Sequence, residues 1–189
     1  MALALGLTYH VDAATGDDLR TPAEAQSAAT PWKTITRAVF HAEGGDTVVV
    51  GAGTYRESVE SKRDGFSTNA PIVLRSAVPG RAVVRPPAGR NGFVISHSFH
   101  TIDGFRIKRA VQGVKLGPHD GGNRAVVGLL VQNNRIQGSI SSGVRVTDGV
   151  DHRVYDNTAF DNGTSDDDDV KILGSLGPTP AQTYHVDCD

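Results

Sequence analysis

Hydrophobic and polar residues alternate along this chain in many short runs, a pattern typical of β-strands. Runs bounded by Gly, Pro or Asn predict strands at residues 7–11, 47–50, 72–75, 82–85, 93–96 and 101–107. Short strands joined by turns bury their apolar side chains by stacking into sheets, so we expect an all-β fold.

One stretch has the spacing of a helix instead, at residues 31–43. Thr30 can cap the first turn, and Pro31 suits the first helical position. Gly44 and Gly45 follow the stretch and end it. The apolar face of this helix would be formed by Trp32, Ile35, Val39 and Ala42.

Three segments repeat a pattern in which a cation stands between two apolar residues, at positions 113–116, 143–146 and 169–172. In a strand the apolar pair would point inward and the cation outward. If the three strands stack as rungs of one parallel sheet, Lys115, Arg145 and Lys171 line up about 4.8 Å apart on an outer face. Such a column suits an anionic polymer, although cations on an outer face also keep a solenoid soluble.

The spacing of these segments indicates a coiled architecture. The series starts at residues 92, 113, 143 and 169, which are coil-sized steps. A second series lies between them, at residues 102–107, 131–136 and 154–159, so each coil has at least two strands. Asn134 and Asn157 align where a coil would turn, and stacked Asn side chains can hydrogen-bond from rung to rung.

Composition and charge limit the classes of function. The chain has 189 residues and a formal net charge of −2, which argues against general binding of nucleic acid or of a membrane surface. A single cysteine, Cys188, excludes an internal disulfide and a cysteine-based zinc site. The apolar run at residues 1–7 is too short for a membrane span or a signal peptide.

Five motifs resemble pectate-lyase-like right-handed parallel β-helix proteins: TYHVD at 8–12, PWKTI at 31–35, GDTVVV at 45–50, GTYRE at 53–57 and TIDGF at 101–105. The resemblance implies a right-handed parallel β-helix over residues 1–175, with the helix at 31–43 capping its N-terminal end. Residues 176–189 would be a linker or the start of a following repeat unit. The resemblance also implies an extracellular or cell-surface location, while that superfamily includes lyases, epimerases, hydrolases and binding proteins.

Lyase chemistry would use the cation column. Elimination in a uronate needs the substrate carboxylate neutralised and a base to take the α-proton. We therefore treat Lys171, Arg145 and Lys115 as candidate catalytic residues, and Lys115, Arg145, His119 and Arg135 as candidate contacts to an acidic polysaccharide. His119 lies in the longest insertion, and Arg135 aligns with Arg106 in a second basic pair that also suits a structural or solubilising role.

Calcium is the expected cofactor of such a lyase, and the candidate ligands are Asp166, Asp167, Asp168 and Asp169. Acidic residues shortly before a lysine base resemble calcium-dependent lyases of the superfamily. Four consecutive Asp residues cannot all point at one ion, so the same run also fits a solvated acidic loop. His97 and His100 are three residues apart without a clear third ligand, which favours ordinary polar packing over a metal site.

Two other functions remain open from the sequence. Asp168 and Asp169 resemble the paired aspartates of β-helix polygalacturonases, but the other motifs of those hydrolases are absent. The segment TYHVD recurs at residues 183–187, which suggests a repeat unit of a longer surface protein and a non-catalytic carbohydrate-binding or adhesion module.

Overall fold

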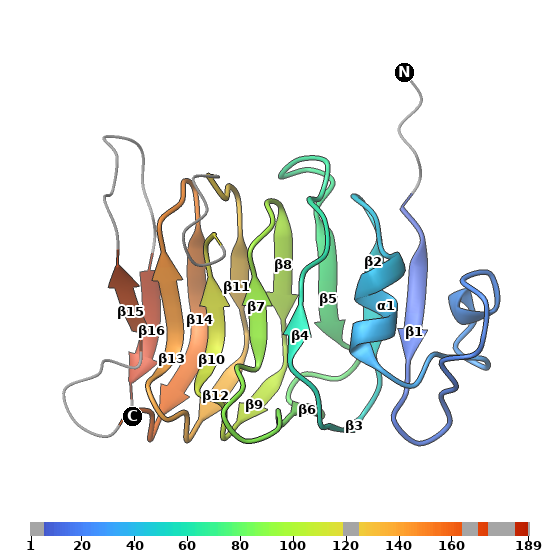
Figure 1. The fold of residues 1–189 in the computed structure, drawn as a ribbon, viewed down its shortest axis with the longest axis horizontal. Helices are drawn as coiled ribbons and strands as arrows, with labels where there is room; N and C mark the ends of the chain where they lie inside the picture. The colour runs from blue at the N-terminus through green and yellow to red at the C-terminus, as the bar shows by residue number, and fades with distance from the viewer. Residues whose placement is uncertain (1–5, 119–124, 164–169, 174–183, 189) are drawn as a thin grey trace.

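The chain forms a parallel β-helix whose coils stack along one axis (Figure 1). The computed structural model describes residues 6–118, 125–163, 170–173 and 184–188. Its helical elements are η1 (Glu24–Gln26) and α1 (Ile35–His41). Its strands are β1 (Thr8–Val11), β2 (Thr47–Val50), β3 (Gly53–Tyr55), β4 (Val59–Glu60), β5 (Ile72–Ser76), β6 (Ala82–Val84), β7 (Phe93–Ile95), β8 (His100–Asp103), β9 (Arg106–Lys108), β10 (Gln112–Leu116), β11 (Leu130–Gln132), β12 (Arg135–Gln137), β13 (Ser142–Thr147), β14 (Arg153–Phe160), β15 (Val170–Leu173) and β16 (Tyr184–Cys188).

All the strands pair in parallel, in two sheets. Sheet B has the order β15-β13-β10-β7-β4. Sheet A has a long arm, β1-β2-β5-β8-β11-β14, and a short arm, β3-β6-β9-β12, and both arms pair with the eight-residue strand β14. One coil therefore runs through sheet B, the long arm and the short arm before it re-enters sheet B, as β10, β11, β12 and β13 do. The predicted right-handed parallel β-helix is confirmed.

The inward side chains of both sheets form one core. Val114, Leu116, Val144 and Val146 of sheet B are buried, and Val131 and Val154 of the long arm join them in the same cluster. Burial of each such side chain stabilises the fold by about 1.5–3 kcal/mol. Because this core lies between the sheets, the outer face of sheet B and the outer face of the long arm point to different sides of the molecule.

Helix α1 packs its buried Ile35, Ala38 and Val39 at the N-terminal end of the coils. The helix is shorter than the predicted 31–43, because the backbone of Trp32 pairs with β1 instead of continuing the helix. The Trp32 N–H donates to the carbonyl oxygen of His10 at 2.9 Å, and the Asp12 N–H donates to that of Trp32 at 2.9 Å. The N-cap is therefore Thr34, whose hydroxyl accepts from the Arg37 N–H at 3.1 Å, and not Thr30.

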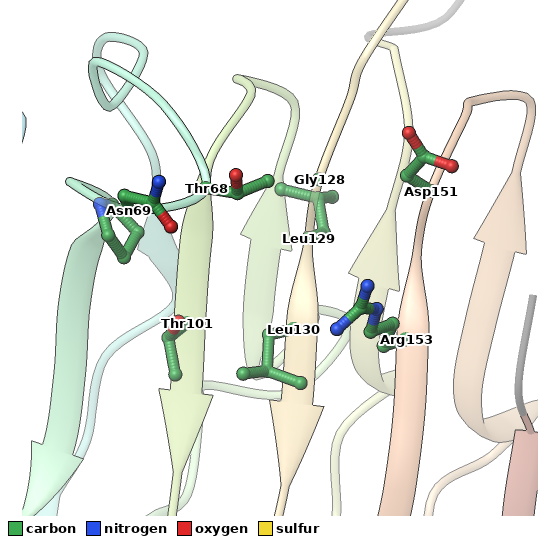
Figure 2. Close-up of a pocket in the computed structure, with 9 residues that line it drawn as sticks. Thr68, Asn69, Thr101, Gly128, Leu129, Leu130, Asp151 and Arg153 are labelled. Atoms are coloured by element: carbon green, nitrogen blue, oxygen red, sulfur yellow. The ribbon is translucent and has the colours of Figure 1, made fainter.

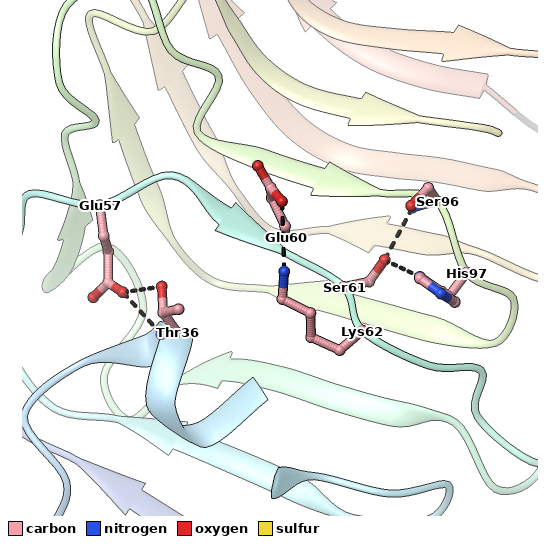
Figure 3. Close-up of polar contacts among 7 residues, drawn as sticks. All are labelled: Thr36, Glu57, Glu60, Ser61, Lys62, Ser96 and His97. Carbon is pink, nitrogen blue, oxygen red and sulfur yellow. Dashed lines mark hydrogen bonds and ion pairs between the residues drawn. The ribbon is translucent and has the colours of Figure 1, made fainter. Parts of the chain in front are cut away.

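The motif GTYRE has a structural role in this cap. Glu57 accepts hydrogen bonds from the backbone N–H groups of Ile35 at 2.9 Å and Thr36 at 2.8 Å, at the first turn of α1. Figure 3 shows this carboxylate facing Thr36. The Tyr55 hydroxyl donates to the carbonyl oxygen of Gly51 at 2.9 Å. A carboxylate at a helix N-terminus satisfies otherwise free N–H groups, so Glu57 fixes the helix onto the coils.

The corner between the long and short arms carries the predicted asparagine ladder. Asn134 and Asn157 are both buried, and each follows a residue with positive φ: Asn133 at 56° and Asp156 at 53°. In the preceding coil Gly104 has the same left-handed conformation, with φ of 73°. This residue breaks the predicted strand 101–107 into β8 and β9, because the chain turns a corner there.

Glycines line the corner where the short arm leads into sheet B. A Cβ atom on Gly113 would overlap Cγ2 of Ile136 and the carbonyl oxygen of Gly143. A Cβ atom on Gly92 would likewise overlap the carbonyl oxygen of Gly113. The glycine that opens the repeats at 92 and 113 is therefore required by the close approach of successive coils.

Candidate functional site

The three cations of the repeat occupy paired positions on neighbouring strands of sheet B. Lys115 of β10 pairs with Arg145 of β13, and Arg145 pairs with Lys171 of β15. Paired residues on neighbouring strands are about 4.8 Å apart. The structure thus brings together the backbone positions of all three candidate catalytic residues. We call Lys115, Arg145 and Lys171 the cation column.

The register arises from the apolar residues on either side of each cation. Val114, Leu116, Val144 and Val146 are buried, as predicted, which fixes the cations on the opposite face of their strands. Val170 and Ile172 were predicted to be buried in the same way, but their side chains lie outside the described residues. A shift of one residue in either strand would place a charge in the core, so the alignment is strongly determined.

Two of these cations, Lys115 and Arg145, are half-buried and not fully exposed, contrary to the prediction. The side chain of Lys171 lies outside the described residues. The Nε atom of Arg145 is shielded from solvent and has no hydrogen-bond partner within the described part of the chain, and the same holds for the hydroxyl of Thr147 two residues later. Both donors lie on the outward side of β13, so this strand offers hydrogen-bonding capacity that its described surroundings do not use.

The first two strands of sheet B, β4 and β7, carry other residue types at the positions aligned with the cation column. Val94 of β7 pairs with Lys115, and Glu60 of β4 pairs with Val94. Glu60 forms an ion pair with Lys62, with Oε2 and Nζ 3.5 Å apart (Figure 3). The positive part of the face therefore begins at β10 and continues at β13.

Arg135, the remaining candidate contact to a polysaccharide within the described residues, belongs to a different face from the cation column. It lies on β12 of the short arm, next to Arg106 on one side and Thr158 on the other. Its guanidinium carbon is 4.6 Å from the ring centroid of Phe160. This cation–π contact is a structural role that the sequence spacing did not indicate.

His97 and His100 both form polar contacts within the protein, and Nδ1 of His100 lies 3.0 Å from the carbonyl oxygen of Ser98. The Ser61 hydroxyl and Nδ1 of His97 are 2.8 Å apart, and Ser61 also accepts from the backbone N–H of Ser96 at 3.0 Å (Figure 3). His100 is buried, and burial lowers its pKa to about 4. Among the described residues no group of three or more His, Cys, Asp or Glu side chains is arranged to hold a metal ion.

Other predicted site residues lie outside the described residues. They are His119 and the four calcium candidates Asp166, Asp167, Asp168 and Asp169. The YHV part of the repeated sequence lies in β1 and again in β16. Both strands are in sheet A, where β1 pairs with β2 and β16 pairs with β14. Within the described ranges, no helix combines the length and apolar character that a membrane crossing requires.

Sequence reasoning missed a groove on the outer face of the long arm. Its lining comes from the loop before β5, from β8, from the segment leading into β11, and from the start of β14. The segment Asp151-His152-Arg153 could have indicated one wall of this groove, because residues two apart in a strand point to the same face. In the structure His152 is buried, while its two neighbours are exposed. The facing wall is about 80 residues away in sequence, between residues 68 and 71, and no local pattern connects the two.

Comparison with known proteins supports the fold. Residues 14–78 match a family described as "Protein of unknown function (DUF1565)". The pectate lyase Pel9A structure is similar with a TM-score of 0.65 and 18% identity, over 85% of this chain and 41% of that one. An alginate lyase from Paenibacillus sp. str. FPU-7 is similar with a TM-score of 0.57 and 19% identity, over 67% of this chain and 41% of that one.

These likenesses are structural and distant. The chain spans about two fifths of the length of each lyase. No curated protein matches the chain in sequence. At such identities the similarity shows a shared parallel β-helix fold, on which unrelated activities are built.

Proposed function

We propose that this protein binds an acidic, uronate-containing polysaccharide on the outer face of sheet B and cleaves it by β-elimination. The observation that carries the proposal is the pairing of Lys115, Arg145 and Lys171 on three successive rungs. The fold shared with a pectate lyase and an alginate lyase supports the same class of ligand. An extracellular or cell-surface location is part of the proposal, since such polymers lie outside the cell.

The column suits a polymer better than a small anion. Like charges directly opposite each other on neighbouring strands repel and destabilise the sheet. A chain of carboxylates laid across the strands would place negative charge beside each rung and remove that repulsion. The unused Nε–H of Arg145 is a further donor on the same face, and hydrogen bonds between charged groups are stronger than those between neutral ones.

The proposed reaction divides two tasks among the three cations of the column. Lys115 and Arg145 would neutralise the uronate carboxylate, which makes the proton on the adjacent carbon acidic. Lys171, as a neutral amine, would take that proton. The electron pair left behind forms a carbon–carbon double bond, the neighbouring C–O bond breaks, and the leaving oxygen takes a proton from solvent water. The products are an unsaturated uronate and a new sugar end.

Calcium would be held by carboxylates of the run Asp166–Asp169, which precedes Lys171 in sequence. Carboxylate oxygens are the ligands that this ion prefers. Bound there, calcium would add positive charge beside the substrate carboxylate. Two of the four side chains are enough for such a site, in agreement with the expectation that four consecutive Asp residues do not converge.

Binding is tested with the polymers themselves. Polygalacturonate, alginate and a glycosaminoglycan are titrated against wild-type protein, the Lys115→Ala/Arg145→Ala double variant, and Arg135→Ala as a matched control on another face. Loss of the two cations should weaken binding about tenfold or more, equivalent to at least about 1.4 kcal/mol. Added salt should weaken wild-type binding, because partly exposed charges are screened. Equal losses in the double variant and in Arg135→Ala would contradict the assignment to sheet B.

Catalysis is tested at Lys171. Cleavage is followed by the ultraviolet absorbance of the unsaturated product, with calcium or with a chelator. Lys171→Ala removes the charge and the base, whereas Lys171→Arg keeps the charge and removes an effective base. A lyase should lose most turnover in both variants while each retains some affinity for the polymer. Full turnover in Lys171→Arg would refute the role of Lys171 as base.

A non-catalytic binding module is the second candidate, favoured by the recurrence of TYHVD at residues 8–12 and 183–187. The YHV parts of the two copies lie in β1 and β16, at separate edges of sheet A. Such a module would be one unit of a longer repeat protein. It should give no unsaturated product with any polymer, and its affinity should fall with Lys171→Ala and largely survive with Lys171→Arg. The two Lys171 variants therefore separate the candidates.

A further inference from the structure

The groove on the long arm is a second surface with the chemistry of a ligand site. It has a volume of about 450 Å³, which lies within the range of small-molecule sites. Figure 2 shows Thr68 and Asn69 on one side of it, Asp151 and Arg153 on the other, and Leu130 between them. The loop that carries Thr68 and Asn69 connects β4 and β5, so two distant parts of the chain build the walls.

This groove is separate from the cation column. Its floor consists of outward side chains of β8 and β11, and Thr101 pairs with Leu130 and Leu130 with Arg153 across the long arm. The inward neighbours Val131 and Val154 belong to the core that the long arm shares with sheet B. A ligand in the groove therefore lies on a different side of the molecule from a polymer on sheet B.

The walls present hydrogen-bonding groups that have no partner among the described residues. Within the described part of the chain, the side chains of Thr68, Asn69, Asp151 and Arg153 form no hydrogen bond or ion pair. Asp151 and Arg153 are exposed and lie two residues apart, yet they do not neutralise each other by contact. A carboxylate, a guanidinium, an amide and a hydroxyl thus face one open space.

The opposite charges in the groove indicate which class of ligand it would bind. Asp151 and Arg153 carry opposite charges, so the groove has no net attraction for a polyanion, unlike the cation column. Leu130 and Pro71 add apolar surface beside these polar groups. A sugar ring has this combination, with C–H groups on its faces and hydroxyl groups around its edge that both donate and accept.

The same face continues along the strands beyond the groove. Gln132 pairs with Tyr155, and both lie two residues beyond the groove residues Leu130 and Arg153. Residues two apart in a strand point to the same face and are about 6.6 Å apart. The half-buried Tyr155 ring and the Gln132 amide therefore extend the polar and apolar surface for a further sugar unit.

We propose that this groove binds an uncharged oligosaccharide segment through Asp151, Arg153 and Asn69, with Leu130 beneath the sugar ring. The protein would then contact glycans on two faces, an acidic one on sheet B and a neutral one on the long arm. This assignment is independent of the proposed lyase activity, since none of its residues belongs to the cation column.

The test uses cellohexaose, xylohexaose and mannohexaose as neutral probes and a galacturonate hexasaccharide as the anionic probe, each titrated by calorimetry into the full chain. The variants are Asp151→Asn, which tolerates the left-handed backbone at φ of 56°, and Arg153→Ala. The controls are Arg135→Ala and the Lys115→Ala/Arg145→Ala double variant. The thermal unfolding of every variant is measured to confirm that it is folded.

At least one neutral probe should bind with a dissociation constant in the millimolar range or tighter. Its affinity should fall about tenfold or more in both groove variants and stay unchanged in both controls. It should also vary little with salt, in contrast to polymer binding on sheet B. Failure of all three neutral probes at millimolar concentration would overturn the proposal, as would binding that survives both groove variants.

Two other outcomes would also overturn it. Displacement of the neutral probe by the galacturonate hexasaccharide, together with loss of both in Lys115→Ala/Arg145→Ala, would show one shared site on sheet B. Self-association that disappears in Arg153→Ala, measured by sedimentation in the absence of sugar, would assign the groove to contact with a second copy of the chain.

Discussion

The side-chain amide of Asn134 donates a hydrogen bond from Nδ2 to Oδ1 of Asn157 in the next coil, over 3.0 Å. The same Asn157 oxygen accepts the backbone N–H of Asn134 at 3.0 Å. Oδ1 of Asn134 in turn accepts the backbone N–H of Phe105 in the preceding coil, at 2.8 Å. Three successive coils are thus joined through two buried amides at one corner.

Replacement of Asn134 should strongly destabilise the fold. Asn134→Ala leaves the buried N–H of Phe105 and the carbonyl oxygen of Ile102 without their side-chain partner. Each buried group left unpaired costs about 1–3 kcal/mol, so we expect the free energy of unfolding to fall by about 3 kcal/mol. Urea denaturation followed by the fluorescence of the single, buried Trp32 measures this change.

The matched control for this ladder is the neighbouring Asn133. It is exposed, its φ is 56°, and among the described residues its side chain donates only to Asp103. Asn133→Gly keeps the left-handed conformation and should cost less than about 1 kcal/mol. Similar decreases in the free energy of unfolding for Asn134→Ala and Asn133→Gly would show that the buried ladder contributes no more to stability than the exposed Asn133 side chain.

Gly113→Ala should disturb the spacing of the coils. The added methyl group would overlap Ile136 and the backbone of Gly143, and backbone cannot move aside without shifting a whole rung. We expect a loss of about 3 kcal/mol in the free energy of unfolding. Gly89→Ala is the control, because its φ is 75° but no atom lies within 4 Å of the new Cβ, so it should cost only about 1 kcal/mol. Equal effects would indicate that backbone conformation, and not contact between coils, determines the cost.

Stability should depend on pH through His100. Burial lowers its pKa from 6.5 to about 4. Because the unfolded chain binds the proton more readily, the contribution of His100 is fully present above pH 6.5 and is lost as the pH falls from 6.5 toward 4. The expected loss is about 3 kcal/mol over that window.

The His100→Gln variant isolates this contribution. The quantity compared is the pH dependence of the free energy of unfolding, not the stability of the variant at neutral pH. The free energy of unfolding of wild-type protein should decrease more steeply between pH 7 and pH 4 than that of the variant, as measured by urea denaturation at a series of pH values. His152, whose pKa burial also lowers, remains in both proteins and contributes equally. Parallel pH profiles would assign the acid sensitivity to other groups.

Calcium should raise the melting temperature if the acidic run binds it. A ligand held only by the native state stabilises it by about 2.7 kcal/mol at one hundred times its dissociation constant. Asp168→Asn/Asp169→Asn should abolish this rise, whereas Asp148→Asn, which removes an exposed carboxylate elsewhere, should retain it. Differential scanning fluorimetry with calcium or with a chelator measures the shift. A rise of the same size in all three proteins would place the ion at another site.

The sequence by itself determined the positions of most strands and the alignment of the cation column. Both follow from local chemistry, because alternation of period two fixes which side chains are inward, and burial of the Val114 and Val144 positions sets the register of their strands. The asparagine ladder at Asn134 and Asn157 was predictable for the same reason, since two aligned repeats must turn at equivalent residues.

Other features were decided only by the tertiary structure. Trp32 has helical spacing, yet its backbone pairs with β1, which is brought to it from 20 residues away, and α1 begins later as a result. Arg135 has the outward position of a ligand contact, but the angle of the corner turns it onto the short arm beside Phe160. The groove is made by the Thr68 loop and by Arg153, which only the stacking of coils brings together. Local patterns specify the face of a strand that a residue occupies, whereas the direction of that face depends on how the turns close each coil.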